Sequence, residues 1–143
     1  MSDVQRGSVV RYAYLWSREY RAGRVEGLKD RPTLVLSLSV QIDNGRTRLL
    51  VVPVTHASPV SPADAVEMPP RVKRTLGLDD ERAWIVTTES NTFTWPGPDV
   101  RPIPGKPPGT FVYGIVPEDF LRRVIDSFLI NQTRASIVPR DET

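Results

Sequence analysis

Three side chains suited to phosphate chemistry lie at the ends of the two most apolar runs of the sequence. Arg31 precedes the run TLVLSL at 33–38, and Thr55 and His56 follow the run LLVVPV at 49–54. A planar guanidinium can bind two phosphate oxygens and remains charged at neutral pH. An imidazole can accept a proton near neutral pH. The pattern therefore indicates a nucleic-acid-directed site at the rim of a small β-barrel.

Each of these residues also has an ordinary structural explanation. An arginine at the start of a strand commonly solvates the edge of a sheet, and a threonine at a strand end often serves β propensity or caps a turn. Adjacent residues of a strand point to opposite faces. If Thr55 faces the site, we therefore expect His56 to face away unless the strand has already ended.

A second group of polar and aromatic residues follows the run AWIVTT. Glu89 and Asn91 stand at alternate positions and so face the same way. The carboxylate and the amide could supply a general base and base-edge recognition, and Trp95 or Phe93 could stack on an unpaired base. In the alternative interpretation, Asn91 bonds its own backbone in a turn and the aromatic rings fill the core.

Positive charge is concentrated in residues 15–30, a polar stretch with two glycines that predicts a long loop. Loops of this length in a compact domain are often functional. Trp16 and Tyr20 accompany the charges and favour contact with a partner, so we expect a flap rather than a solvated, mobile loop. The cationic residues of this predicted flap are Arg18, Arg21, Arg24 and Lys29.

Hydrophobic periodicity predicts a mainly β domain with one C-terminal helix packed against a strongly bent sheet or barrel. The expected strands are 8–14, 33–38, 48–55, 65–68, 83–88 and 111–116. Asn44-Gly45 predicts the hairpin turn between the second and third strands. The expected helical segments are a turn at 69–76 and an amphipathic helix at 117–130.

The connecting segments carry their own signals. Residues 89–97 predict a polar stretch closed by a turn, and residues 96–110, rich in proline and glycine, predict an irregular loop. Pro53 lies inside an apolar run, and because proline cannot donate to a strand ladder, it indicates an edge position or a bulge.

Composition limits the classes of function. The chain has 143 residues, which fits a single domain over 1–143, no cysteine and one histidine. We therefore expect no disulfide, no thiol nucleophile and no cysteine- or histidine-based metal set. A carboxylate metal site stays possible, but no Asp/Glu spacing indicates one, so we predict no metal site and no cofactor. Residues 1–74 hold 12 Lys/Arg against 7 Asp/Glu, which is compatible with a phosphate-bearing partner. No membrane span or secretory signal is evident, so we expect a soluble, cytoplasmic protein.

Three motifs together resemble the PemK/MazF toxins of bacterial toxin-antitoxin modules. They are Gly7-x-Val9-Val10, Arg31-Pro32-x-Leu34-Val35-Leu36-Ser37 and Val51-Val52-Pro53-Val54-Thr55, which cover the family's order over residues 7–58. The remainder is similar to a divergent branch. The resemblance implies an SH3-like CcdB/PemK-type barrel, a homodimer, a cognate antitoxin partner and metal-independent cleavage of single-stranded mRNA.

The resemblance also implies roles for individual residues. Arg31 would be the electrophile or acid, and Thr55 would contact a phosphate or the 2′-OH. The flap would guide RNA, with Trp95 as a stacking platform. The family pattern has no histidine at the position of His56, and it gives no definite role to Glu89 or Asn91, so their catalytic or RNA-binding roles remain hypotheses.

Three functions are open at this point. The first is a sequence-selective endoribonuclease toxin, which Arg31 and Thr55 favour. The second is a non-catalytic toxin that binds DNA gyrase or another protein, as relatives similar to CcdB do with an aromatic residue near the chain's end. The polar end INQTRASIVPRDET lacks that feature. The third is an inactive relative that binds only an antitoxin or nucleic acid.

Overall fold

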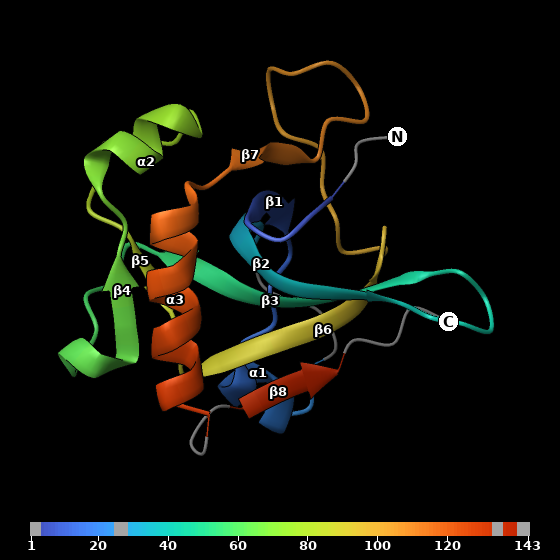
Figure 1. Ribbon diagram of the computed structural model, residues 1–143, viewed down its shortest axis with the longest axis horizontal. Coiled ribbons are helices and arrows are strands. Elements are labelled where there is room, and N and C mark those ends of the chain that lie inside the picture. Colours follow the sequence, from blue (N-terminus) through green and yellow to red (C-terminus); the bar gives the residue numbers. More distant parts are fainter. Residues whose placement is uncertain (1–3, 25–28, 133–135, 140–143) are drawn as a thin grey trace.

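The strands of this chain form one sheet that carries a long helix on one side (Figure 1). A computed structural model describes residues 4–24, 29–132 and 136–139. The strands of the sheet are β1 (Ser8–Tyr12), β2 (Arg31–Val40), β3 (Thr47–Thr55), β4 (Ala65–Glu67), β5 (Trp84–Val86), β6 (Glu89–Trp95), β7 (Val112–Ile115) and β8 (Ser136–Pro139). The helices are α1 (Ser17–Arg21), α2 (Pro70–Thr75) and α3 (Glu118–Ile130), with a 3₁₀ turn η1 (Pro62–Asp64). The predicted mainly β class with a C-terminal helix is confirmed.

The sheet is organised around β3. Its path runs β4-β5-β3-β2-β1-β7, and β6 pairs with both β3 and β8. All strand pairs in the described residues are antiparallel except β6 with β8. Because β2 and β3 form the predicted hairpin, the first residue of β2 and the last residue of β3 lie at the same end of the sheet.

Pro53 lies within the central strand β3 rather than at an edge, and the ladder shift in this hairpin falls between Val35 and Ser37 of β2. The position of Pro53 nevertheless tolerates the absence of a backbone N–H. On its other side β3 pairs with β6 as far as Val51 and with β5 only from Val54, so Pro53 lies where the partner strand changes. A missing N–H on that side of β3 therefore costs no ladder bond.

Two cores hold the sheet. Alternate residues of β1, β2 and β3 face either the cluster under α3 or a second cluster on the opposite side, as the two-residue period of a strand requires. The predicted stripe of α3 is buried at Phe120, Leu121, Val124 and Phe128. Burying each such side chain stabilises the fold by about 1.5–3 kcal/mol. The second cluster contains Tyr12, Tyr14, Phe93 and Trp95.

Three elements differ from the predictions. The predicted loop 15–30 contains the short helix α1, and its residues 25–28 lie outside the described part of the chain. The predicted polar stretch 89–97 is the strand β6. A further strand, β8, follows α3. None of the described helices is long and apolar enough to cross a membrane.

Candidate functional site

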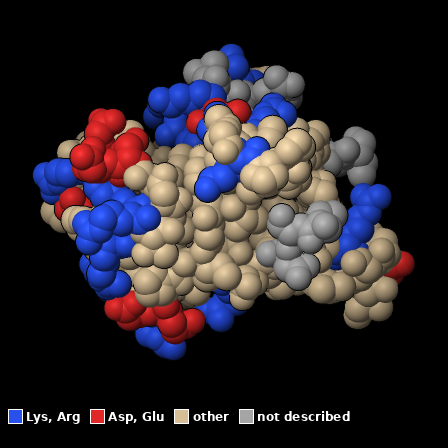
Figure 2. Space-filling model, turned by 90° about the horizontal axis from the view of Figure 1, so that it is seen from above, with Lys and Arg blue, Asp and Glu red and all other residues tan. Residues whose placement is uncertain are grey.

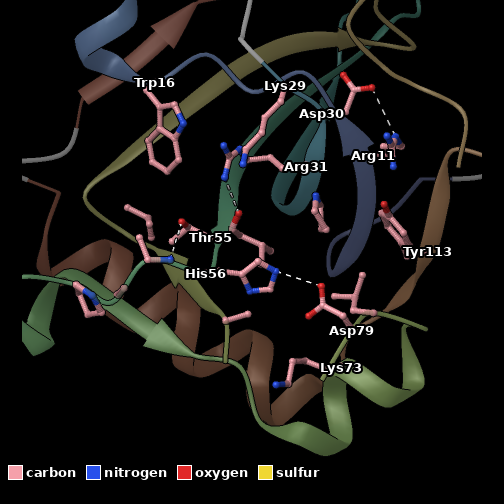
Figure 3. A pocket seen from close by; sticks show the side chains of 18 of the residues that line it. Arg11, Trp16, Lys29, Asp30, Arg31, Thr55, His56, Lys73, Asp79 and Tyr113 are labelled. Carbon is pink, nitrogen blue, oxygen red and sulfur yellow. Dashed lines mark hydrogen bonds and ion pairs between the residues drawn. The ribbon is translucent and has the colours of Figure 1, made fainter. Parts of the chain in front are cut away.

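An open cavity of about 850 Å³ lies where the start of β2 and the end of β3 face α2 and the loop after it (Figure 3). Positive side chains outnumber negative ones in its wall. The charged lining residues are Arg11, Arg18, Lys29, Arg31 and Lys73, with Asp30, Asp64 and Asp79. Thr55 and His56 line the same cavity. The structure thus brings together five residues that the sequence analysis selected: Arg31, Thr55, His56, Arg18 and Lys29.

Arg31 is fixed at the cavity wall by the sheet. It is the first residue of β2, opposite Tyr12 of β1, and its Nη1 donates a hydrogen bond to the carbonyl oxygen of Val54 at 3.2 Å. Its Nε is buried and has no hydrogen-bond partner. A buried N–H without an acceptor is costly. Arg31 lines the cavity, so an anion bound there would lie next to its guanidinium.

The electrostatic environment of Arg31 suits an anion. Burial lowers the pKa of the guanidinium, and Arg18 lowers it further, while Glu19 opposes the change. Arginine nevertheless stays protonated in proteins, because its ordinary pKa is so high. The result is a partly desolvated cation, and charge-assisted hydrogen bonds are strongest in such surroundings.

Trp16 packs against this cation. The guanidinium carbons of Arg31 and Arg18 lie 5.0 Å and 5.6 Å from the centre of the Trp16 ring. Both contacts are within the range of a cation–π interaction. The backbone N–H of Trp16, at the N-terminal end of α1, donates to Glu19 Oε1 at 3.0 Å. The sequence analysis placed Trp16 only in a charged flap.

Asn91 and Glu89 hold the segment on either side of Trp16. Leu15 N–H donates to Asn91 Oδ1 at 3.0 Å, and Asn91 Nδ2 donates to the Leu15 carbonyl at 2.8 Å. Ser17 N–H donates to Glu89 Oε1 at 2.8 Å. The side chains of Asn91 and Glu89 point to the same side of β6, as predicted. They act on the protein backbone, which suggests positioning rather than direct contact with RNA.

Two predicted RNA contacts are therefore corrected. Asn91 is fully buried and both of its amide atoms are bonded to Leu15, so it cannot read a base edge. Trp95 is 9% exposed and packs edge-on against Phe111 in the second core, so its ring is not available for stacking. Neither residue bonds its own turn, because both lie in β6. Glu89 does not line the cavity.

Of the remaining predicted residues, Thr55 and His56 line the cavity, whereas Arg21 and Arg24 do not. Thr55 Oγ1 accepts a hydrogen bond from the Ala57 N–H at 3.1 Å, which caps the turn that follows the strand. β3 ends at Thr55, so the alternation of side chains between the two faces of a strand no longer applies to His56, which also faces the cavity. Arg21 and Arg24 are exposed and do not line it.

The sequence analysis did not identify several lining residues. Asp30 lies between Arg11, at 3.6 Å, and Arg101, at 3.4 Å, and so fixes the backbone just before Arg31. Lys73 is almost completely buried and donates to the Asp80 and Glu81 carbonyls at 3.3 and 2.6 Å. Arg11 and Arg101 are far from Asp30 in the sequence, so no local signal indicates that these charges lie together.

The pH dependence of stability gives a test of the Glu89 contact. Burial raises the pKa of the Glu89 carboxyl, although hydrogen bonds from Ser17 and Tyr14 oppose this. The folded state then binds a proton more tightly than the unfolded state. Stability is therefore expected to fall as pH rises from the ordinary value of 4.5 through the raised folded pKa.

Glu89→Gln is expected to remove this loss, because glutamine keeps a carbonyl acceptor for Ser17 without the buried charge. Urea unfolding from pH 4 to pH 7 measures the difference in unfolding free energy between variant and wild type. That difference should shift in favour of the variant as pH rises. Glu118→Gln, at an exposed carboxylate on α3, is the matched control. A difference that stays constant across this range would contradict the assignment.

Comparison with protein-family models and with curated proteins finds no match to this chain. The structure defines a mainly β domain with a cationic cavity at one end of its central hairpin. Membership of the PemK/MazF family stays a prediction that depends on the three sequence motifs.

Proposed function

We propose that this protein is a toxin that binds single-stranded RNA in the cavity and cleaves it at selected sequences without a metal ion. The observation that carries the proposal is the Arg31 guanidinium, which is partly buried at the wall of an 850 Å³ cavity with an unpartnered Nε. Thr55 stands at the end of the adjacent strand, as in the motif pair that resembles the PemK/MazF toxins. The cavity is large enough for a nucleotide rather than a lone phosphate ion.

The charge of the cavity, rather than that of the whole surface, favours RNA. The net charge of the chain is only +2. On the face seen in Figure 2, Lys and Arg lie beside Asp and Glu around an uncharged central area. Phosphate binding therefore depends on local groups, of which Arg11, Arg18 and Lys29 accompany Arg31. Such an arrangement positions one phosphate rather than coating a long duplex.

The proposed reaction is attack of the RNA 2′-oxygen on the adjacent phosphorus. The 2′-O–P bond forms and the P–O5′ bond breaks, which leaves a 2′,3′-cyclic phosphate and a 5′-hydroxyl. The 2′-OH loses its proton and the leaving oxygen gains one. Arg31 would stabilise the charge that develops on the phosphorane. The Thr55 hydroxyl would contact the phosphate or the 2′-OH, and His56 stands next to it on the cavity wall.

The proposed partners follow from the resemblance. A cognate antitoxin would compete with RNA for the cavity, and two copies of the chain would form a homodimer. Apolar residues that are exposed in the isolated chain include Ile115, Leu129 and Ile130, with 47%, 56% and 79% of their surfaces accessible. These side chains are available for protein contacts.

Incubation of the purified protein with a long single-stranded RNA in excess EDTA tests the proposal. We expect discrete cuts whose 3′ ends carry a 2′,3′-cyclic phosphate. Cleavage that requires added Mg²⁺ would contradict the mechanism. An RNA left intact by a folded protein would overturn the catalytic proposal and favour a binding function, directed at DNA gyrase, another protein or an antitoxin.

A further inference from the structure

A histidine and two carboxylates converge at the rim of the cavity. His56 Nε2 lies 3.2 Å from Asp79 Oδ2 (Figure 3). One ligand atom from each of His56, Asp79 and Glu81 lies within 4.8 Å of the others. His56 follows β3, whereas the two acids lie in the loop between α2 and β5. The convergence is therefore produced by the fold and not by sequence spacing.

The hydrogen bonds of His56 define what its Nε2 needs. Nδ1 lies 2.8 Å from the backbone carbonyl oxygen of Arg82, which can only accept, so Nδ1 carries the hydrogen. Nε2 then faces the Asp79 carboxylate, which also only accepts when ionised. In a neutral ring, the Nε2 lone pair would point at a carboxylate oxygen, which is a repulsive contact. Either a proton or a metal ion at Nε2 removes this conflict.

A histidine whose Nδ1–H bonds a backbone carbonyl is in the tautomer that metal-binding histidines use. The separation of Nε2 and Oδ2 is also suitable. Two donors that each lie about 2.1 Å from one Zn²⁺ are about 3.0–3.4 Å apart at right-angle or tetrahedral geometry. The 3.2 Å separation found here lies inside that interval.

The surrounding contacts orient the Asp79 carboxylate and pair the nearby Arg82 with a different acid. Glu81 N–H donates to Asp79 Oδ1 at 3.1 Å, which leaves Oδ2 directed at His56. The side chain of Arg82 is held by both oxygens of Glu67, at 2.8 and 2.9 Å. Lys73 donates to backbone carbonyls of the acidic loop and so fixes its path.

We propose that His56, Asp79 and Glu81 bind a divalent transition-metal ion of the zinc type. One imidazole and two carboxylates suit Zn²⁺ and its neighbours better than Mg²⁺ or Ca²⁺, which prefer oxygen ligands alone. All three residues are exposed, so water can complete the coordination shell. The ion would link the end of β3 to the loop after α2 and add positive charge beside Thr55. The cleavage mechanism proposed above does not use this ion.

Isothermal titration of the tag-free protein with ZnCl₂ tests this site, together with NMR spectra of protein labelled with ¹⁵N-histidine. Because the chain has one histidine, every imidazole signal reports on His56. We expect one ion per chain and a large shift of the Nε2 resonance with Nδ1 still protonated. His56→Ala, His56→Gln and Glu81→Gln should each weaken binding about tenfold or more.

Asp126→Asn is the matched control, since Asp126 is an exposed carboxylate on α3, and its affinity should equal that of the wild type. An absence of heat and of Nε2 shift at millimolar Zn²⁺ would overturn the proposal. Unchanged binding in the two folded His56 variants would also overturn it. RNA cleavage is measured separately in EDTA, so failure of the ribonuclease proposal and failure of the metal site give different results.

Discussion

Arg31→Ala is expected to lower the rate of RNA cleavage by about 10²–10³-fold, the usual cost of removing one preorganised donor to a transition-state anion. The guanidinium carries the positive charge and the N–H donors of this side chain at the cavity wall. Alanine leaves no donor in its place. Single-turnover cleavage of a defined single-stranded RNA in EDTA gives the rate. Growth arrest on expression should be lost in parallel.

Two further variants separate charge from geometry. Arg31→Lys keeps a positive charge but loses the planar fork, so we expect activity between those of the wild type and Arg31→Ala. Arg123→Ala removes an exposed arginine of α3, which does not line the cavity, and should cleave at the wild-type rate. A fully active Arg31→Ala protein would remove Arg31 from the mechanism.

The folded state of Arg31→Ala must be verified, because Arg31 also has structural contacts. It donates to the Val54 carbonyl and packs on Trp16. Loss of one hydrogen bond costs about 1 kcal/mol, and loss of a partly desolvated cation–π contact costs about 0.5–2 kcal/mol. We therefore expect a modestly lower urea midpoint and an unchanged circular dichroism spectrum. An inactive variant that is folded locates the defect in the site.

The hairpin explains why part of the site could be predicted from sequence. The apolar runs and Asn44-Gly45 define two antiparallel neighbours, and antiparallel pairing puts the start of β2 beside the end of β3. Arg31 and Thr55 must then lie near one another. The helix α3 could be predicted equally well, because its apolar stripe and Pro117 are local signals.

β6 shows where local patterning fails. Glu89, Asn91, Thr92 and Thr94 make the strand look like a polar turn, yet it lies between β3 and β8. Asn91 is buried and Glu89 is half-buried, and both bond the segment after β1, about 75 positions away in the sequence. Sequence periodicity correctly predicted that Glu89 and Asn91 share a face. It could not show that this face is turned toward the protein.

The acidic loop beside His56 was unpredictable for a similar reason. Asp79 and Glu81 read as solvated charges in the sequence, and only the pairing of β5 with β3 and β4 brings their loop to the end of β3. The expectation of no metal site depended on the single histidine, which cannot make a histidine-based set, and on the lack of a suggestive Asp/Glu spacing. A mixed set of one histidine and two carboxylates needs tertiary contacts to be recognised.

Asn91→Ala is expected to lower the free energy of unfolding by about 2–4 kcal/mol. The side chain is fully buried, and alanine would leave both the N–H and the carbonyl of Leu15 without these partners. Each buried backbone group that loses its partner costs about 1–3 kcal/mol. Urea unfolding monitored by circular dichroism measures the change.

The contacts of Asn91 also connect stability to the cavity. Leu15 precedes Trp16, whose ring packs on Arg31, so loosening Leu15 should displace that ring. Cleavage by the folded fraction of Asn91→Ala is then expected to fall as well.

Asn44→Ala is the matched control, because Asn44 bonds one backbone N–H in the exposed hairpin turn and its loss should cost under about 1 kcal/mol. Equal losses in the two variants would show that the Leu15 contacts contribute no more than an exposed turn. A larger loss in Asn91→Ala, with reduced cleavage, would identify β6 as the element that positions Trp16.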